Sequence, residues 1–228
     1  MGHEIERVAV SRGHNVVGKL EAGWEELPSC DVAIEFTQPT TALQNITKAL
    51  EQGVPIVSGT TGWLKDWEKA VAEVERYSGA FFYASNFSIG VYLFRLINRQ
   101  LAHLMNSYPN YHPSLEEIHH IHKLDYPSGT ALTLANDMLE ELANKWECKA
   151  YMDTCEAPED KEGQLLIRSV REGEVPGTHI IRYESDEDLI EIKHEAKGRS
   201  GLALGAVLAG EFLLGKKGVF EMKDLVGI

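Results

Sequence analysis

Cysteine is scarce in this sequence, and long apolar runs are absent. The three cysteines, Cys30, Cys148 and Cys155, lack the paired C-x-x-C spacing of zinc and redox sites, which favours reduced, structural thiols. No apolar run reaches the roughly 18 residues of a membrane span. The charged start MGHEIERVAV does not fit a secretory signal. These absences predict a soluble, cytoplasmic protein with no membrane partner.

Basic residues are also few compared with acidic ones. The 22 Lys and Arg against 35 Asp and Glu give a formal net charge of −13 over 228 residues. Such a charge repels a phosphate backbone unless the basic residues gather in one patch, so no nucleic-acid partner is expected. The hydrophobic share of 43% is that of a globular protein. The length allows one large domain or two interleaved ones.

The first half of the chain alternates helical and strand patterns. Because parallel strands need crossovers, usually helices, this order predicts an α/β fold with a doubly wound, Rossmann-like parallel sheet. Such a fold starts with a strand and a glycine-rich turn, whereas this sequence starts with a helical pattern. We therefore expect an N-terminally truncated sheet that lacks its first strand. The expected helices are 1–13, 41–51 and 64–77, and the expected strands are 15–20, 31–36, 54–57 and 80–83.

The pattern changes after a long amphipathic helix expected over 91–105. Strand-like runs separated by acidic or Gly/Pro turns predict an inserted α+β domain over residues 105–204. The sheet domain then comprises residues 1–104 and 205–228. In the second half we expect extended segments over 115–122, 165–170, 179–184 and 188–195, helices over 131–146 and 201–214, and a short strand and turn over 218–225.

The segment from Glu117 to Ala131, EIHHIHKLDYPSGTA, carries the clearest chemical pattern. Three histidines, a lysine and an aspartate precede a Pro-Ser-Gly-Thr turn that opens a helix. Ser128 is a good N-cap, and the turn exposes backbone amides that suit an anion. Lys123 adds a full positive charge. In a protein with a strong negative charge, this local cationic pocket predicts a small acidic substrate.

Two other interpretations of this segment remain open. Ser128 can be a plain helix cap among surface or core histidines. A metal-binding module is the other, because His120 and His122 alternate onto one strand face and Asp125 could join them. No thiolate or second carboxylate is placed to complete a tetrahedral set, so we predict no metal site.

The same segment resembles the signature of the 4-hydroxy-tetrahydrodipicolinate reductase family, also called dihydrodipicolinate reductase, of the diaminopimelate and lysine pathway. The resemblance implies NAD(P)H-dependent reduction of 4-hydroxy-tetrahydrodipicolinate to tetrahydrodipicolinate, in which a cyclic dicarboxylate loses water, receives a hydride and needs a proton beside it. It also implies a homotetramer formed through the sheets of the inserted domain, which suits its edge-rich strands. Further segments fit this family in order: FTQP at 36–39, GTTGW at 59–63, SNFSIG at 85–90 and GRSGLALGA at 198–206.

The resemblance assigns roles within the pocket. It makes His119 the acid/base residue and Lys123 its partner at the substrate. An imidazole can supply a proton near neutral pH, and an ammonium can neutralise a carboxylate. Substrate contacts are implied for His120, Ser128, Gly129, Thr130 and Arg199.

The cofactor contacts implied by the resemblance follow the strands of the first domain, where doubly wound sheets bind ligands. Glu21, at the end of an expected strand, would bond the adenosine ribose. No arginine directly follows it, which favours NADH over NADPH, although family members use either. Gly59 would allow close backbone approach to the nicotinamide ribose. The full set is Gly2, Glu21, Phe36, Thr37, Gly59, Thr60, Thr61, Ala84, Ser85, Asn86 and Phe87.

The start of the sequence departs from the family pattern. Only Met1 and Gly2 remain of its first strand and glycine-rich turn, and that turn carries phosphate contacts. We therefore expect this chain to bind dinucleotide poorly. The departure favours an alternative, a cofactor-impaired remnant or metabolite-binding module that keeps the dicarboxylate pocket. A second alternative is another two-domain dehydrogenase that acts on an aldehyde or sugar. That function would not explain why the PSGTA motif follows HHIHK.

Overall fold

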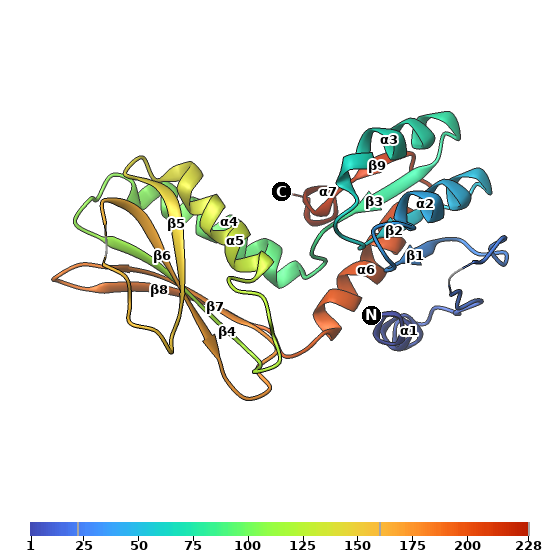
Figure 1. Cartoon of the computed structure of the whole chain (residues 1–228). Coiled ribbons are helices and arrows are strands. Elements are labelled where there is room, and N and C mark those ends of the chain that lie inside the picture. The colour runs from blue at the N-terminus through green and yellow to red at the C-terminus, as the bar shows by residue number, and fades with distance from the viewer. Residues whose placement is uncertain (22, 160, 228) are drawn as a thin grey trace. The chain divides into compact units, whose positions relative to one another are not determined.

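The computed structural model describes residues 1–21, 23–159 and 161–227. The chain forms two compact units (Figure 1), which we call unit 1, Met1–Tyr92 with Arg199–Ile228, and unit 2, Leu93–Gly198. The sequence predicts domain boundaries after residues 104 and 204. These positions lie within helices α4 (Ile89–Met105) and α6 (Ser200–Leu213), C-terminal to the boundaries between the two units.

Unit 1 contains a four-stranded, wholly parallel sheet in the order β1-β2-β3-β9. Every residue of the two central strands is buried, as expected for a parallel sheet covered on both faces. This confirms the predicted α/β class. The strands are β1 (Ala33–Glu35), β2 (Ile56–Ser58), β3 (Ala80–Tyr83) and β9 (Gly218–Phe220).

Helices pack on both faces of this sheet (Figure 1). On one face, Ile46 and Leu50 of α2 pack with Phe81 and with the fully buried Trp63. On the other face, α6 packs against Val57 and Phe82, and α1 packs against α6. The remaining helices of unit 1 are α1 (Gly2–Ser11), α2 (Ala42–Glu51), α3 (Trp67–Arg76), which follows the short 3₁₀ turn η1 (Leu64–Asp66), and α7 (Met222–Val226).

Several sequence-based expectations about secondary structure are wrong, and two of them concern whole segments. Residues 15–20 form no strand, and Val17 and Leu20 of that run are about half exposed. A β-branched run becomes a strand only where a neighbouring strand accepts its backbone hydrogen bonds. The helix expected over 131–146 ends at Glu141, because Ala143 donates its amide to Asn106 and the chain then enters a strand.

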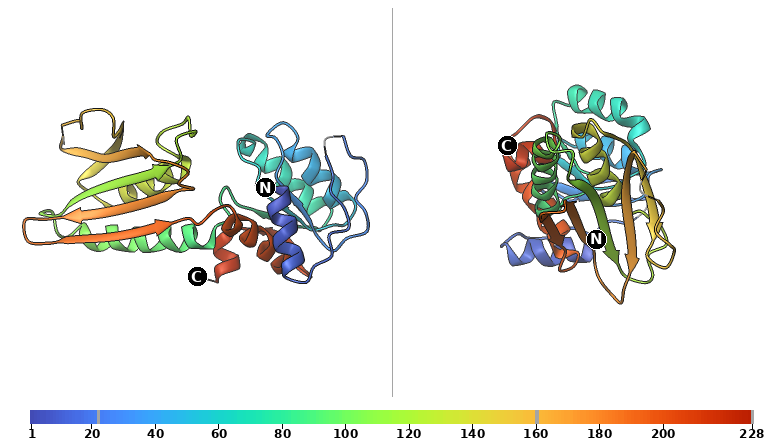
Figure 2. Two further views of the ribbon diagram at one scale, coloured as in Figure 1. Left: turned by 90° about the horizontal axis from the view of Figure 1, so that it is seen from below. Right: turned by 90° about the vertical axis from the view of Figure 1, so that its left-hand side faces the viewer.

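Unit 2 contains a five-stranded mixed sheet in the order β5-β6-β4-β7-β8. The pairs β5–β6 and β6–β4 are parallel, and β4–β7 and β7–β8 are antiparallel. Helices α4 and α5 (Gly129–Glu141) lie along one face of this sheet (Figure 2), as an α+β domain requires. The strands are β4 (His112–His119), β5 (Lys145–Met152), β6 (Gly163–Arg171), β7 (Thr178–Glu184) and β8 (Leu189–Glu195).

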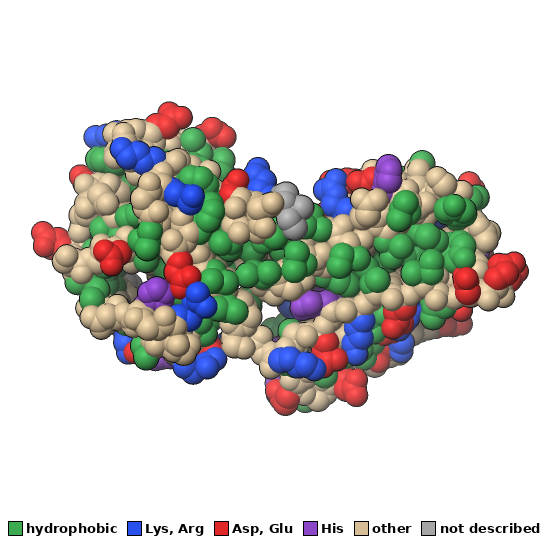
Figure 3. Space-filling view, turned by 180° about the vertical axis from the view of Figure 1, so that it is seen from behind, with side chains coloured by type: hydrophobic (Ala, Val, Ile, Leu, Met, Phe, Trp, Pro, Cys, Tyr) green, Lys and Arg blue, Asp and Glu red, His purple; other side chains and the backbone are tan. Residues whose placement is uncertain are grey.

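The surface carries charges of both signs. On the face shown in Figure 3, Lys and Arg side chains alternate with Asp and Glu side chains rather than gathering in one basic patch. Among the described residues, no helix has the length and apolar character needed to cross a membrane.

The packing of α6 against the segment after β3 predicts a sharp difference between two glycines. A Cβ added at Gly205 would stand 1.7 Å from the carbonyl oxygen of Phe87, whereas one at Gly201 would stand 3.9 Å from its nearest neighbour, Ser88. We expect Gly205→Ala to destabilise unit 1 by about 3 kcal/mol or more, because backbone must move. Gly201→Ala, the control, should be neutral or slightly stabilising. Urea unfolding of both variants measures this, and equal midpoints would contradict it.

Candidate active site

Three polar side chains form one row across the centre of the unit 2 sheet. Glu117 on β4 stands in register with Ser169 on β6 and with His179 on β7. All three are buried, with exposed fractions of 0%, 0% and 4%. Side chains alternate along strands, so this row points to the same face as the next apolar row, which packs under α4 and α5. That apolar row is Leu115, Ile167 and Ile181.

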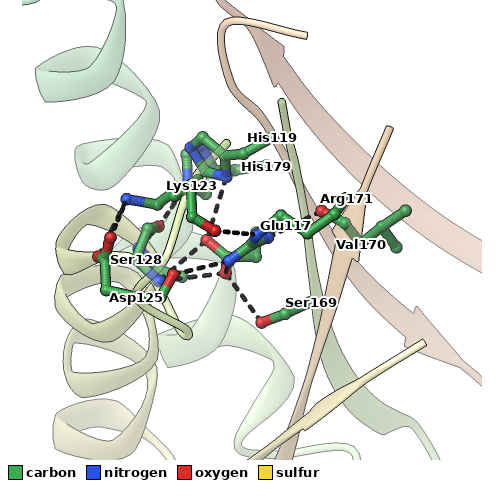
Figure 4. Close-up of polar contacts among 10 residues, drawn as sticks. Glu117, His119, Lys123, Asp125, Ser128, Ser169, Val170, Arg171 and His179 are labelled. Carbon is green, nitrogen blue, oxygen red and sulfur yellow. Dashed lines mark hydrogen bonds and ion pairs between the residues drawn. The ribbon is translucent and has the colours of Figure 1, made fainter. Parts of the chain in front are cut away.

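Glu117 is the centre of this polar group (Figure 4). Its oxygens accept from the Ser128 amide at 3.1 and 3.0 Å and from Ser169 Oγ at 2.8 Å, and Arg171 Nη2 lies 3.4 Å away. His119 Nδ1 lies 3.3 Å from Glu117 Oε2. Burial opposes the charged form, but the contacts from His119, Ser128 and Ser169 prevail and hold the pKa of Glu117 well below its usual range. The carboxylate is therefore charged at neutral pH.

Ser128 begins helix α5, as the sequence predicts. Its side chain accepts the Ala131 amide at 3.1 Å, and its own amide is held by Glu117. The first amides of a helix have no acceptor within that helix. Those of Gly129 and Thr130, in the first turn, are therefore the ones the helix end offers to an anion.

Lys123 is held beside this helix end by a loop that Arg171 fixes. Arg171 donates to the carbonyl oxygens of Lys123 at 3.3 Å and Asp125 at 2.7 Å. Lys123 Nζ lies 2.8 and 2.9 Å from the two carboxylate oxygens of Asp125. The hydrogen bond from Lys123 lowers the pKa of Asp125. A bound anion would thus meet a lysine that already has a carboxylate partner.

His179 is a site residue that the sequence analysis missed. Its ring centroid lies 5.3 Å from that of His119, and its Nε2 lies 3.3 Å from Ser128 Oγ. Burial, together with nearby His119, lowers the pKa of His179 to about 4. The ring is neutral at neutral pH. Only the strand pairing reveals it, because 59 residues of unrelated pattern separate His179 from His119 in the sequence.

The histidines after β4 do not join this group. The strand expected over 115–122 ends at His119, and His122 lies in an exposed turn where it contacts Glu174 at 2.9 Å. The ring of His120 lies 5.9 Å from that of His122. Asp125 pairs with Lys123, so the metal-ligand set considered from the sequence is not assembled.

A different trio does bring ligand atoms together. Glu117, His119 and His179 each place one such atom within 4.8 Å of the others. The two Glu117 oxygens, however, already accept from the Ser128 amide and Ser169, and the Arg171 guanidinium stands beside them. A cation there would have to displace these donors, so the trio does not fit a metal ion.

In unit 1, a second buried carboxylate organises two of the expected cofactor residues. Glu35, at the end of β1, accepts from Thr37 Oγ1 at 2.7 Å and Thr60 Oγ1 at 2.9 Å, and also from Ser58 Oγ. The Thr37 amide donates to Thr60 Oγ1 at 2.7 Å. Parallel strands therefore bring these two threonines together around Glu35, which the sequence did not point to.

Phe36, Gly59 and Phe87 also lie together. A Cβ at Gly59 would stand 2.1 Å from the Phe36 ring, so that ring needs the glycine. Phe36 and Phe87 have centroids 5.6 Å apart. Ala84 is buried, Asn86 Oδ1 accepts the Ser88 amide, and Thr61 and Ser85 are exposed.

Three other predicted residues make none of the contacts described above. Gly2 is the exposed first residue of α1. Glu21 lies exposed in the irregular segment between α1 and β1, because the strand expected to carry it does not form. Arg199 is an exposed residue at the start of α6 in unit 1.

An open hollow of about 710 Å³ borders the loops that follow β1 and β2. Pro39 and Gly62, from the same loops as Thr37 and Thr60, line it. Lys48, Lys65 and Lys69 line it together with Asp66, which pairs with Lys69 at 2.7 Å, so the walls carry a net positive charge. The hollow lies where doubly wound sheets bind ligands.

Comparisons with known proteins identify the family. Residues 1–87 match the profile described as dihydrodipicolinate reductase, N-terminus, and residues 90–226 match the C-terminus of the same family. This chain belongs to the dihydrodipicolinate reductase family. A 4-hydroxy-tetrahydrodipicolinate reductase of Christiangramia forsetii is 44% identical, covering 99% of this chain and 93% of its own. One from Neisseria meningitidis serogroup B is 33% identical, covering 89% and 74%.

A solved structure supports the fold of this dihydrodipicolinate reductase family member. It is the dipicolinate-bound dihydrodipicolinate reductase from Paenisporosarcina sp. TG-14, with a TM-score of 0.70 and 20% identity, covering 98% of this chain and 94% of its own. The resemblance stated from the sequence motifs is thereby confirmed at the level of family and fold.

The buried, neutral His179 predicts a pH-dependent stability. The pKa of His179 is about 4 in the folded protein against 6.5 for an ordinary histidine. Below pH 6.5 the unfolded chain binds a proton that the folded chain refuses until about pH 4. The free energy of unfolding should therefore fall by about 3 kcal/mol between these values from this group alone.

Urea unfolding at several pH values measures this loss. His179→Asn should flatten the decline between pH 6.5 and 4, and the exposed His112→Gln should leave it unchanged. An identical decline in His179→Asn and the unaltered chain would show that another group is responsible.

Proposed function

We propose that this chain catalyses the NAD(P)H-dependent reduction of 4-hydroxy-tetrahydrodipicolinate to tetrahydrodipicolinate, a step of diaminopimelate and lysine biosynthesis, in the cytoplasm. Family membership supports the reaction. The observation that carries the proposal is the grouping of His119, Lys123 and the Ser128 turn around the buried Glu117. This group offers a proton donor, a cation and the first amides of a helix within one cluster of side chains.

The helix end and Lys123 would bind the substrate carboxylates. The amides of Gly129 and Thr130 can donate to one carboxylate, and the helix dipole favours its charge. Lys123, only 20% exposed, can exchange Asp125 for a substrate carboxylate. The solved relative is described as bound to dipicolinate. Dipicolinate is a planar ring with two carboxylates, and the proposed substrate is also a ring that carries two carboxylates.

His119 would supply the proton. Its side chain lies at the edge of the polar row and is 10% exposed, so a bound ring could reach it. Bound NAD(P)H supplies the hydride. We assign the proton that arrives beside it to the His119 imidazole, because imidazole is the side chain that most often serves as a general acid. His120 and Arg199 stay proposed substrate contacts on the family resemblance alone.

The dinucleotide would bind at the carboxyl ends of the unit 1 strands. Thr61, Ser85 and Asn86 would offer hydroxyl and amide groups there. The hydroxyls of Thr37 and Thr60 already donate to Glu35, so these two residues would hold the loops in place, and Phe36 packs on the buried Phe87 beside them. These groups suit a ribose and a nicotinamide ring. The hollow lined by lysines suits the anionic part of the molecule. Ala84, Gly59, Glu21 and Gly2 complete the proposed set, with NADH favoured over NADPH.

We also propose a homotetramer that assembles through the unit 2 sheet. Helices cover one face of that sheet, and the alternation of side chains leaves Leu166, Val170 and Leu189 on the other. Light scattering of the purified chain should give four times the 25.4 kDa chain mass. Val170→Glu should give smaller species, because a new charge buried at the interface without a partner is costly. A monomer mass for the unaltered chain would contradict the assembly.

The reaction is tested with freshly generated hydroxytetrahydrodipicolinate, using NADH and NADPH in parallel. We expect His119→Ala to lower kcat by about 10²-fold or more, because it removes the proton donor. Lys123→Ala should lower kcat/KM by about 10²-fold, because a charged hydrogen bond to the substrate is lost. His103→Ala, an exposed histidine on α4, is the control and should retain full activity. Substantial activity in both site variants would remove their assigned roles.

A further inference from the structure

We propose that Glu117 is a positioning residue for proton transfer: it holds the His119 ring through Nδ1 and leaves Nε2 as the nitrogen that delivers the proton. This inference rests on the proposed role of His119 as the proton donor. It explains why Glu117 is present in the site although it is buried and would not contact the substrate.

The first support is the position of the two groups. Glu117 is fully buried, and its Oε2 lies 3.3 Å from His119 Nδ1. That Nδ1 is itself buried and has no hydrogen-bond partner within the described chain, so the Glu117 carboxylate, at ion-pair distance, is the acceptor nearest to hand. Because Glu117 and His119 are two residues apart on one strand, their side chains share a face, and a small rotation of the ring would align Nδ1 with the carboxylate. The carboxylate is thus the acceptor available to an Nδ1 proton.

The second support is that Glu117 is anchored independently of His119. The Ser128 amide and Ser169 Oγ hold its oxygens at 3.0 and 2.8 Å. A carboxylate fixed by such donors cannot turn to follow the ring, so the ring must adopt the orientation that the carboxylate sets. Glu117 also fixes the Ser128 amide, so the proton donor and the anion-binding helix end share one anchor.

The charged and titratable groups around Glu117 leave its charge available to His119. Arg171 has its shorter hydrogen bonds to the carbonyl oxygens of Asp125 and Val170, at 2.7 and 2.8 Å, against 3.4 Å to Glu117. Lys123 pairs with Asp125. His179 is neutral at neutral pH, and burial also lowers the pKa of His194 on β8. Among these groups, His119 is the one placed to receive a proton and touch a substrate.

The third support is the space at the other nitrogen. A Cβ at Gly177, just before β7, would stand 3.0 Å from His119 Nε2. Gly177 has a φ of +155°, a backbone conformation that disfavours other residues. The missing side chain keeps atoms away from the nitrogen that we assign to proton delivery.

The decisive measurement is the position of the ring proton in the unaltered chain. Nitrogen-15 NMR of histidine-labelled protein distinguishes a ring protonated at Nδ1 from one protonated at Nε2, and His119→Ala assigns the signal. We expect neutral His119 to carry its proton on Nδ1. A proton on Nε2 would overturn the proposal. This readout needs neither cofactor nor turnover, so it stands even if His119→Ala were to keep full activity and the proposed role of His119 failed.

The matched variant is Glu117→Gln, which keeps the size of the side chain and an oxygen for the Ser128 amide. We expect the NMR signal to shift toward the other tautomer, kcat to fall by about 10²-fold and KM to change by less than about threefold. The alkaline limb of the pH–rate profile should move down by about one pH unit, because the imidazolium loses its neighbouring anion. Glu117→Asp, which keeps the charge, should restore the limb and part of kcat.

A purely structural role for Glu117 predicts a different result. Affinity for dipicolinate, measured by calorimetry, would fall together with the melting temperature, and the tautomer and the pH limb would not move. Either of those two readouts staying fixed in folded Glu117→Gln would overturn the proposal. Asp137→Asn, which changes a buried carboxylate of α5 paired with Arg95 at 2.8 Å, is the control and should leave the tautomer and kcat unchanged. If Glu117→Gln fails to fold, the tautomer in the unaltered chain and the Glu117→Asp profile decide.

Discussion

The buried carboxylate of Glu117 is the interaction on which the site in unit 2 depends. A charge with no exposure survives in a protein only if donors surround it, and here the donors are the parts of the site: the Ser128 amide, Ser169, Arg171 and His119. Because Glu117 is out of contact with water, losing any one of these donors would leave a buried charge without a hydrogen bond, at a high cost in free energy. The cost of burying this carboxylate therefore keeps the Ser128 turn and the His119 ring in fixed positions around it.

The sheet of unit 2 makes this concentration of polar groups possible. The inward positions of β4, β6 and β7 change from apolar to polar at the same row, where the cover of α5 ends at its first residue. The apolar rows fix the strand register, because a slip of one residue would turn the core outward. The same register then places Glu117, Ser169 and His179 side by side. Core packing and site geometry are thus one constraint.

The sequence predicted the parts of this molecule that depend on local pattern. The strand 80–83, the helices around α1, α2 and α6 and the cap at Ser128 follow from periodicity and capping chemistry. What it could not predict depends on pairing between distant strands. His179 joins the site through its register with Glu117, Glu35 collects hydroxyls from the next strand, and residues 15–20 stay irregular despite their β-branched composition.

The pairing of Lys123 with Asp125 has a consequence for ligand choice. Asp125 would compete with a ligand carboxylate for Lys123. Its effective concentration is high because it lies two residues along the same loop. A free monocarboxylate would compete poorly against it. In the proposed binding mode, a molecule that binds the Gly129 and Thr130 amides through one carboxylate is already held at the site. Its second carboxylate would then displace Asp125 from Lys123. In the proposed binding mode, this loop would therefore favour acids with two carboxylates over acids with one.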